Sequence, residues 1–190
     1  MTFDYLLNLI GPRGFFDLAT VAQLSDEPRQ TIRMQLHRWC AAGKLVSLRR
    51  GMYALAPPYR RREINPALLA NELYTPSCLS LHWALGYYGL IPEKAVTFTS
   101  VSTRQTREFH NAFGTFRYRT LRKSLFFGLG PVKMGDETIM VAAPEKVLLD
   151  LWHLQHGEWP AARMEGMRFQ NSGLVDIDRL RAYAGRWRAP

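Results

Sequence analysis

Apolar side chains in the first 24 residues recur at the spacing of amphipathic helices. Four of them occupy positions i, i+3, i+4 and i+7, which lie on one face of a helix. These four are Phe3, Leu6, Leu7 and Ile10. Gly11-Pro12 interrupts the pattern, and apolar positions resume over residues 16–24. The pattern therefore predicts a helix over residues 3–10 and a shorter helix over residues 16–24.

A third helix is predicted to begin directly after Asp26-Glu27-Pro28. These residues supply an acidic capping side chain and a proline in the first turn, and both favour a helix start. Ile32, Leu36 and Trp39 then lie on one helical face, and Gly43 is a natural terminator.

Two β-prone runs follow the third helix, over residues 45–48 and 52–55. Arg49-Arg50-Gly51 joins them, which predicts a hairpin with a cationic tip. Helix, short helix, tight turn, helix and hairpin is the order of a winged helix-turn-helix. We therefore predict such a DNA-binding domain over residues 1–62, closed by the linker Pro57–Arg62.

The pattern changes after residue 62 to a mixture of helices and short strands. Predicted helices cover residues 66–74, 79–88, 143–154 and 178–187, and predicted strands cover residues 95–101, 115–121, 125–127 and 138–142. Runs of helices beside runs of strands favour an α+β domain with an antiparallel sheet. The fold class expected for the whole chain is α+β, with this second domain over residues 63–190.

Positive charge is concentrated in the first of these domains. The chain carries a net charge of +9, with 25 Lys and Arg against 16 Asp and Glu. Residues 1–62 hold ten of these cations and four of these acids, so a third of the chain carries a net charge of +6. This excess points to an anionic partner, with nucleic acid first, and a membrane surface or an acidic protein as the alternatives.

The third helix combines charge with side chains that read bases. Arg29, Arg33 and His37 are spaced by four, and Gln30 lies beside them on the face opposite the apolar stripe. Arg can chelate guanine and Gln can chelate adenine in the major groove. A merely solvated face is the alternative for this helix taken alone. Adding the cationic hairpin favours DNA binding.

Several segments, taken in order, resemble one protein family. They are TIRMQLHRWCAAGKLVSLRRGMYAL, PSCLSLHWALGYYGLIPE, TSVSTRQTREF, FRYRTL, FFG and APEKVLLDL. Together they resemble the AbiEi-type antitoxins and transcriptional regulators of type IV toxin–antitoxin systems, over about residues 14 to 155. The C-terminal set, with its Ala-Pro-Glu-Lys block, is the more distinctive part.

The resemblance implies a two-part protein. Its winged helix would bind repeats in double-stranded operator DNA and repress its own operon. Its C-terminal domain would counteract a nucleotidyltransferase-like toxin, with or without direct contact. By matching position, Arg29, Thr31 and Arg33 fall where such modules contact DNA, and Arg49-Arg50-Gly51 falls on the wing.

Two groups in the C-terminal domain are candidates for toxin antagonism. One is a strip of cations, namely Arg104, Arg107, Arg117, Arg119, Arg122 and Lys123. It could bind a toxin, contact DNA, or keep a sheet edge from aggregating. The other is Glu145 and Lys146, for which a helix-start carboxylate and a surface ion pair between Lys146 and Asp150 is the favoured interpretation.

The sequence contains no recognisable catalytic motif or metal-ligand cluster, so we do not expect an enzyme. His153, His156 and Asp150 could share a helical face, but no further ligand accompanies them, so we expect no metal and no cofactor. No phosphate loop or nucleophile elbow is present.

Cys40 and Cys78 are expected to be buried thiols in a reducing cytosol. No apolar run is long enough to span a membrane. The second hypothesis is a winged-helix regulator whose C-terminal domain dimerises or senses a ligand.

Overall fold

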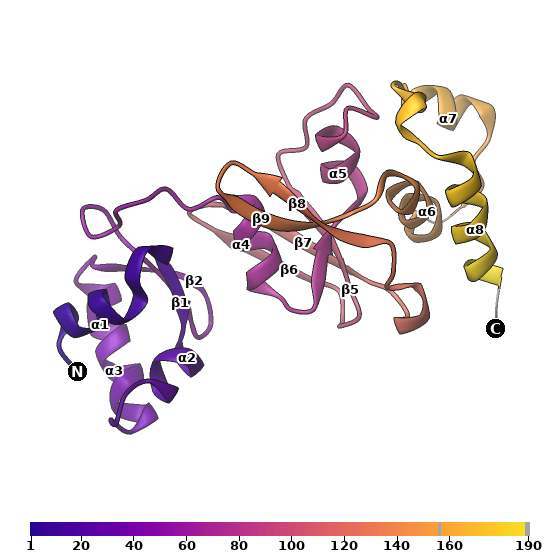
Figure 1. Ribbon diagram of the computed structural model, residues 1–190. Helices are drawn as coiled ribbons and strands as arrows, with labels where there is room; N and C mark the ends of the chain where they lie inside the picture. The colour runs from indigo at the N-terminus through magenta and orange to yellow at the C-terminus, as the bar shows by residue number, and fades with distance from the viewer. Residues whose placement is uncertain (156, 189–190) are drawn as a thin grey trace. The chain divides into compact units, whose positions relative to one another are not determined.

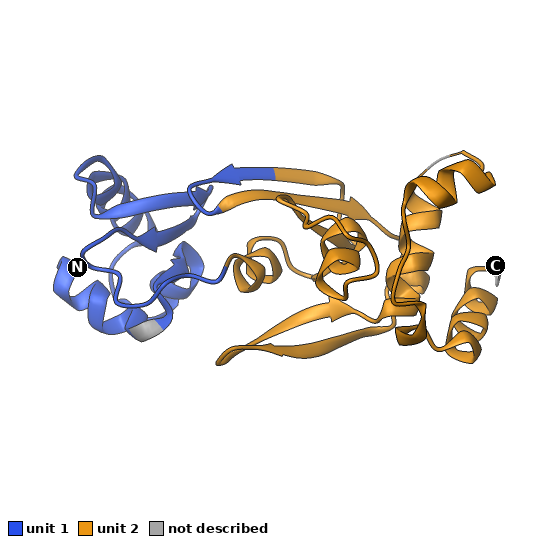
Figure 2. Ribbon diagram, turned by 90° about the horizontal axis from the view of Figure 1, so that it is seen from above, with its two compact units in different colours: residues 1–65, 109–113 blue, residues 66–108, 114–190 orange. Residues whose placement is uncertain are grey.

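The computed structural model describes residues 1–155 and 157–188 and is a mixed α+β structure with two sheets (Figure 1). The chain divides into two compact units, which Figure 2 distinguishes by colour. Unit 1 comprises residues 1–65 together with residues 109–113, and unit 2 comprises residues 66–108 together with residues 114–190. The sequence placed the division after Arg62, three residues before the end of the first segment of unit 1.

Unit 1 contains three α-helices and a small antiparallel sheet. Its elements are α1 (Phe3–Ile10), a 3-10 turn (Gly11–Arg13), β1 (Phe15–Asp17), α2 (Leu18–Gln23), α3 (Arg29–Ala41), β2 (Leu45–Arg49) and β3 (Met52–Leu55). The strand order is β1-β3-β2, and both pairings are antiparallel. The predicted positions of α1, α3 and the hairpin are confirmed.

The start of α2 differs from the prediction. Phe15 and Phe16 pair with Ala54 and Tyr53 of β3, so these residues form a strand and the helix begins only at Leu18. Asp17 caps that helix by accepting a hydrogen bond from the Thr20 backbone amide at 2.7 Å. The predicted acidic cap of α3 is wrong, because Pro28 is the residue at its N-cap and no side chain bonds there.

The core of unit 1 fixes which face of α3 meets solvent. Ile32 and Leu36 are fully buried in an apolar cluster that also contains Leu6 of α1 and Leu45 of β2. Trp39 continues this stripe, with its ring edge-on to Phe3 at 5.2 Å between centroids. Because the apolar stripe of α3 packs against α1 and β2, the opposite face of α3 is directed outward.

Unit 2 contains a six-stranded sheet with helices packed against it, except that residues 109–111 of that sheet belong to unit 1. Its helices are α4 (Pro66–Leu73), α5 (Leu81–Tyr87), α6 (Pro144–Leu154), α7 (Ala161–Gly166) and α8 (Ile177–Arg188). Its strands are β4 (Ser77–Leu79), β5 (Phe98–Ser102), β6 (Arg107–Asn111), β7 (Gly114–Thr120), β8 (Leu129–Met134) and β9 (Glu137–Ala142). The strand order is β6-β7-β5-β4-β9-β8. Helix α4 packs on β4, β5 and β9, while α6 packs on α5 and α8.

The sheet of unit 2 is mixed, so the prediction of an antiparallel sheet is wrong. Strands β4 and β5 pair antiparallel, as do β8 and β9, but β4 with β9 and β5 with β7 pair parallel. The predicted strand over residues 125–127 is also wrong, because Lys123–Leu125 forms a 3-10 turn and no strand follows there.

Among the described residues, no helix is long and apolar enough to cross a membrane.

Candidate nucleic-acid interface

Helix α3 carries four of the predicted DNA-contacting side chains on its exposed face. Arg29, Gln30, Arg33 and His37 are all exposed, opposite the buried Ile32 and Leu36. A spacing of three and four residues places such side chains on one helical face. The first turns of α3 therefore present two guanidinium groups and an amide to solvent.

These side chains line a concave surface together with the hairpin turn. The concavity has a volume of about 670 Å³. Its lining residues are Leu18, Arg29, Gln30, Arg33, His37, Arg50, Gly51 and Tyr53. Six of the eight predicted DNA-contacting residues are thus brought together, and no carboxylate lies among the lining residues. The surface favours an anionic partner.

The hairpin turn is held against the start of α2. The Leu18 backbone amide donates a hydrogen bond to the Gly51 carbonyl at 2.8 Å. Gly51 has a φ of 79°, in the left-handed region that glycine adopts without a Cβ penalty. This geometry fixes the adjacent Arg50 at the rim of the concavity, beside the exposed face of α3.

Two predicted residues are not part of the lining. Thr31 is half-buried on α3, on a different side of the helix from Arg29 and Arg33. Arg49 is half-buried, and its guanidinium donates to the Arg50 carbonyl at 3.1 Å, so it braces the turn.

Leu18 and Tyr53 line the concavity although the sequence analysis did not select them. Tyr53 alternates with the buried Met52 and Ala54 along β3, so strand periodicity could have placed it on the outer face. Its ring packs on Phe16, with centroids 5.8 Å apart. Burial raises the pKa of Tyr53, and the nearby Arg33 opposes that rise.

The cationic strip of unit 2 does not converge on one site. Arg104 lies over the Tyr74 ring at 4.3 Å and donates to the Thr75 carbonyl. Arg117 pairs with Glu108 at 2.6 Å, and Arg119 donates to the Leu154 carbonyl at 3.2 Å. Arg107, Arg122 and Lys123 are exposed. At least four members of the strip, Arg107 included, are therefore engaged with their own surroundings.

Glu145, Lys146 and Asp150 are buried, which corrects the prediction of a surface ion pair. Lys146 pairs with Asp150 one turn later on α6, and both side chains have no exposed surface. Ser80 donates a hydrogen bond to the other oxygen of Asp150 at 2.8 Å. Glu145 accepts from the Asp176 backbone amide at 2.8 Å, just before α8.

Helix α8 supplies part of the cover over this pair. The Lys146 ammonium lies 4.8 Å from the centre of the Trp187 ring and 5.4 Å from that of Phe127. Burial lowers the pKa of Lys146 and raises the pKa of Asp150, while the two partners oppose each other's shift. The same surroundings raise the pKa of the buried Cys78 thiol, chiefly through burial. Cys40 is a free thiol as well but is only half-buried.

No group of three or more possible metal ligands occurs in the part of the chain that the structure describes. His153 is exposed on α6, with its ring 6.0 Å from that of Trp187. His156, the other histidine weighed as a ligand, lies outside the described residues.

Comparison with protein-family models finds no match for the chain. Comparison with curated proteins finds none either.

Proposed function

We propose that the protein is an antitoxin of a type IV-like toxin–antitoxin system that binds operator DNA and represses its own operon. In this proposal unit 1 is a winged helix-turn-helix, in which α2 and α3 are the paired helices and the β2–β3 hairpin is the wing. Unit 2 counteracts a nucleotidyltransferase-like toxin, with direct binding not required.

The observation that carries the DNA-binding proposal is the concave surface shared by α3 and the hairpin turn. An α-helix about 10–12 Å across fits the major groove, which is about 12 Å wide. With α3 in the groove, Arg29, Gln30 and Arg33 would reach base edges from the first turns of the helix. Arg50 would meet a phosphate from the adjacent turn, as wings do in such complexes.

The antitoxin proposal depends on the ordered C-terminal motifs and on cations of unit 2. Its contact residues would be the exposed Arg104, Arg107 and Arg117, together with the half-buried Arg119. Glu145 and Lys146 are buried, so they would not touch a toxin. They would contribute by fixing the position of α8, through the Asp176 amide and the Trp187 ring.

A cavity in unit 2 supports the second candidate function, a regulator that senses a ligand. It has a volume of about 220 Å³ and lies among α6, α7 and α8. Its lining is largely apolar and includes Leu148, Trp152, Met164 and Leu180. Small apolar cavities of this kind bind compact apolar molecules.

A growth assay combined with DNA binding separates the two candidates. The full chain is expressed in cells that also express the toxin encoded by the neighbouring gene, and its binding to the promoter duplex is measured by fluorescence anisotropy. An antitoxin restores growth and binds the promoter. Promoter binding without any restoration of growth would favour the ligand-sensing regulator, and failure to bind the promoter would contradict both.

Arg50→Ala is expected to weaken binding to all duplexes alike. The variant loses one phosphate contact, so the slope of log affinity against log salt should fall by about 1. Anisotropy titrations at several salt concentrations measure this slope. Lys133→Ala, which removes an exposed cation from β8 of unit 2, is the matched control and should leave the slope unchanged. An unaltered slope in Arg50→Ala would remove the hairpin turn from the DNA contact.

A further inference from the structure

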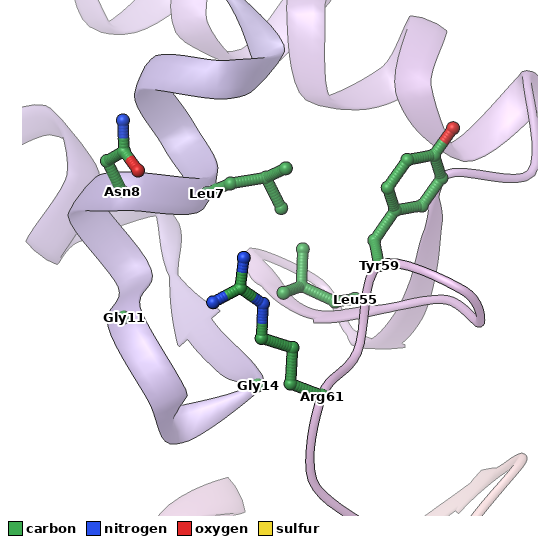
Figure 3. A pocket seen from close by; sticks show the side chains of 7 residues that line it. All are labelled: Leu7, Asn8, Gly11, Gly14, Leu55, Tyr59 and Arg61. Carbon is green, nitrogen blue, oxygen red and sulfur yellow. The ribbon is translucent and has the colours of Figure 1, made fainter.

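A second pocket of unit 1 lies between α1 and the segment that follows β3 (Figure 3). Its volume is about 240 Å³, and none of the predicted DNA-contacting residues lines it. Leu7 and Asn8 come from α1, Leu55 ends β3, and Tyr59 and Arg61 follow it. The pocket is therefore distinct from the concave surface of α3.

Arg61 is the charged group of this pocket. Its guanidinium is turned toward Leu7 and Leu55 in Figure 3. The described residues offer it neither a hydrogen-bond acceptor nor an ion-pair partner, and no carboxylate lines the pocket. A guanidinium presents parallel N–H donors that match the two oxygens of a carboxylate. Arg61 is exposed, so the pocket has a planar cationic fork at its edge, and no hydrogen bond or ion pair from the described residues occupies that fork.

The other walls of the pocket combine three apolar side chains, Leu7, Leu55 and the Tyr59 ring, with the polar Asn8 amide and the backbone of two glycines. Leu55 is almost fully buried, and its backbone amide donates to the Gly14 carbonyl at 2.8 Å. The Tyr59 ring packs edge-on against Phe3, with centroids 4.9 Å apart. Asn8 adds one side-chain amide at the edge. The Leu7, Leu55 and Tyr59 side chains favour a ligand with a compact apolar part.

The size of the pocket restricts that ligand to a small molecule. A cavity of about 150 Å³ holds a benzene ring, whereas drug-sized ligands occupy about 300–1,000 Å³. A volume of about 240 Å³ therefore suits one ring, or a short branched chain, together with a carboxylate. Inorganic phosphate could also pair with Arg61, but it has no apolar part to contact Leu7 and Leu55.

We propose that this pocket binds a small organic monocarboxylate with a compact apolar body, whose carboxylate pairs with Arg61. The apolar body contacts Leu7, Leu55 and the Tyr59 ring. This proposal stands on the pocket alone and does not require that unit 1 bind DNA.

Titration of the full chain with benzoate, followed by calorimetry and by amide NMR, tests the proposal. Benzamide is the matched probe, because it keeps the ring and the shape but removes the charge. A charge-assisted pair with Arg61 should make benzoate bind about ten- to one-hundred-fold tighter than benzamide. The amide signals of Gly11 and Gly14, which line the pocket, should shift on titration.

Three variants localise the binding. Arg61→Ala should lose the same ten- to one-hundred-fold in benzoate affinity, and Arg61→Lys should recover part of it because it keeps the charge but not the fork. Arg62→Ala removes the same charge one residue along the chain, outside the pocket lining, and should change the affinity less than about two-fold. Circular dichroism of each variant shows that the fold is kept.

Several results would overturn the proposal. They are no measurable benzoate binding, equal affinity for benzoate and benzamide, and equal loss in Arg61→Ala and Arg62→Ala. Inorganic phosphate binding as tightly as benzoate would also overturn it, because the pocket would then be an unselective anion site.

Discussion

Asp150→Ala is expected to destabilise the protein by about 3–5 kcal/mol, because it leaves the Lys146 ammonium buried without its partner. Neither side chain of the pair has exposed surface, so water cannot replace the lost carboxylate. The substitution also removes the acceptor of the Ser80 hydroxyl, which is itself fully buried. Urea unfolding of the full chain, followed by tryptophan fluorescence, measures the change in free energy of unfolding.

A matched control and a compensated variant make this result specific. Asp178 pairs with Arg181 on the surface of α8 and is 93% exposed, so Asp178→Ala should change stability by less than about 0.5 kcal/mol. Replacing Lys146, Asp150 and Ser80 together by Met, Leu and Ala removes every member of the polar group. That triple variant should recover most of the loss, because apolar side chains of similar volume replace buried ion pairs at little cost. A loss below about 1 kcal/mol in Asp150→Ala would show that the pair is hydrated in solution.

Arg33→Ala is expected to weaken operator binding by about 1–3 kcal/mol and to relax specificity at one base pair. Arg33 is exposed on α3 and lines the concave surface, where a guanidinium can chelate guanine. Affinities for the operator and for duplexes substituted at each position, measured by anisotropy at one salt concentration, give both quantities.

Arg38→Ala is the control for this prediction. Arg38 is an exposed cation in the last turn of the same helix and does not line the concave surface. Its removal should lower affinity less and leave the base preference intact. If Arg33→Ala keeps the base preference of the unaltered chain, Arg33 contacts phosphate rather than a base.

The local elements of unit 1 could be predicted because each depends on short-range patterns. The apolar spacing of α1, the buried stripe of Ile32 and Leu36 and the glycine at the hairpin turn all act within a few residues. The outward face of α3 follows from the same stripe, so Arg29, Gln30, Arg33 and His37 could be selected from the sequence.

What sequence patterns missed involves contacts between distant segments. Strand β1 exists because Phe15 and Phe16 pair with β3, more than 35 residues away in the chain. The parallel pairing of β4 with β9 joins Leu79 to Val141, and no local periodicity reports the direction of such a partner. Thr31 and Arg49 were selected by motif position, but helix rotation and a bond to the turn carbonyl keep them out of the concave surface.

The sequence by itself determined where the helices of unit 1 begin and end within a few residues, and which of their faces is charged. Periodicity, glycine positions and charge are properties of neighbouring residues, so they can be read without coordinates. Only the tertiary structure decided that Lys146 and Asp150 are buried and that Arg50 joins Arg33 at one concave surface. It also decided that Arg61 lines a pocket together with Leu7 and Leu55. Burial and proximity depend on what the rest of the chain packs against a residue, and that packing brings together segments whose separation along the sequence carries no local signal.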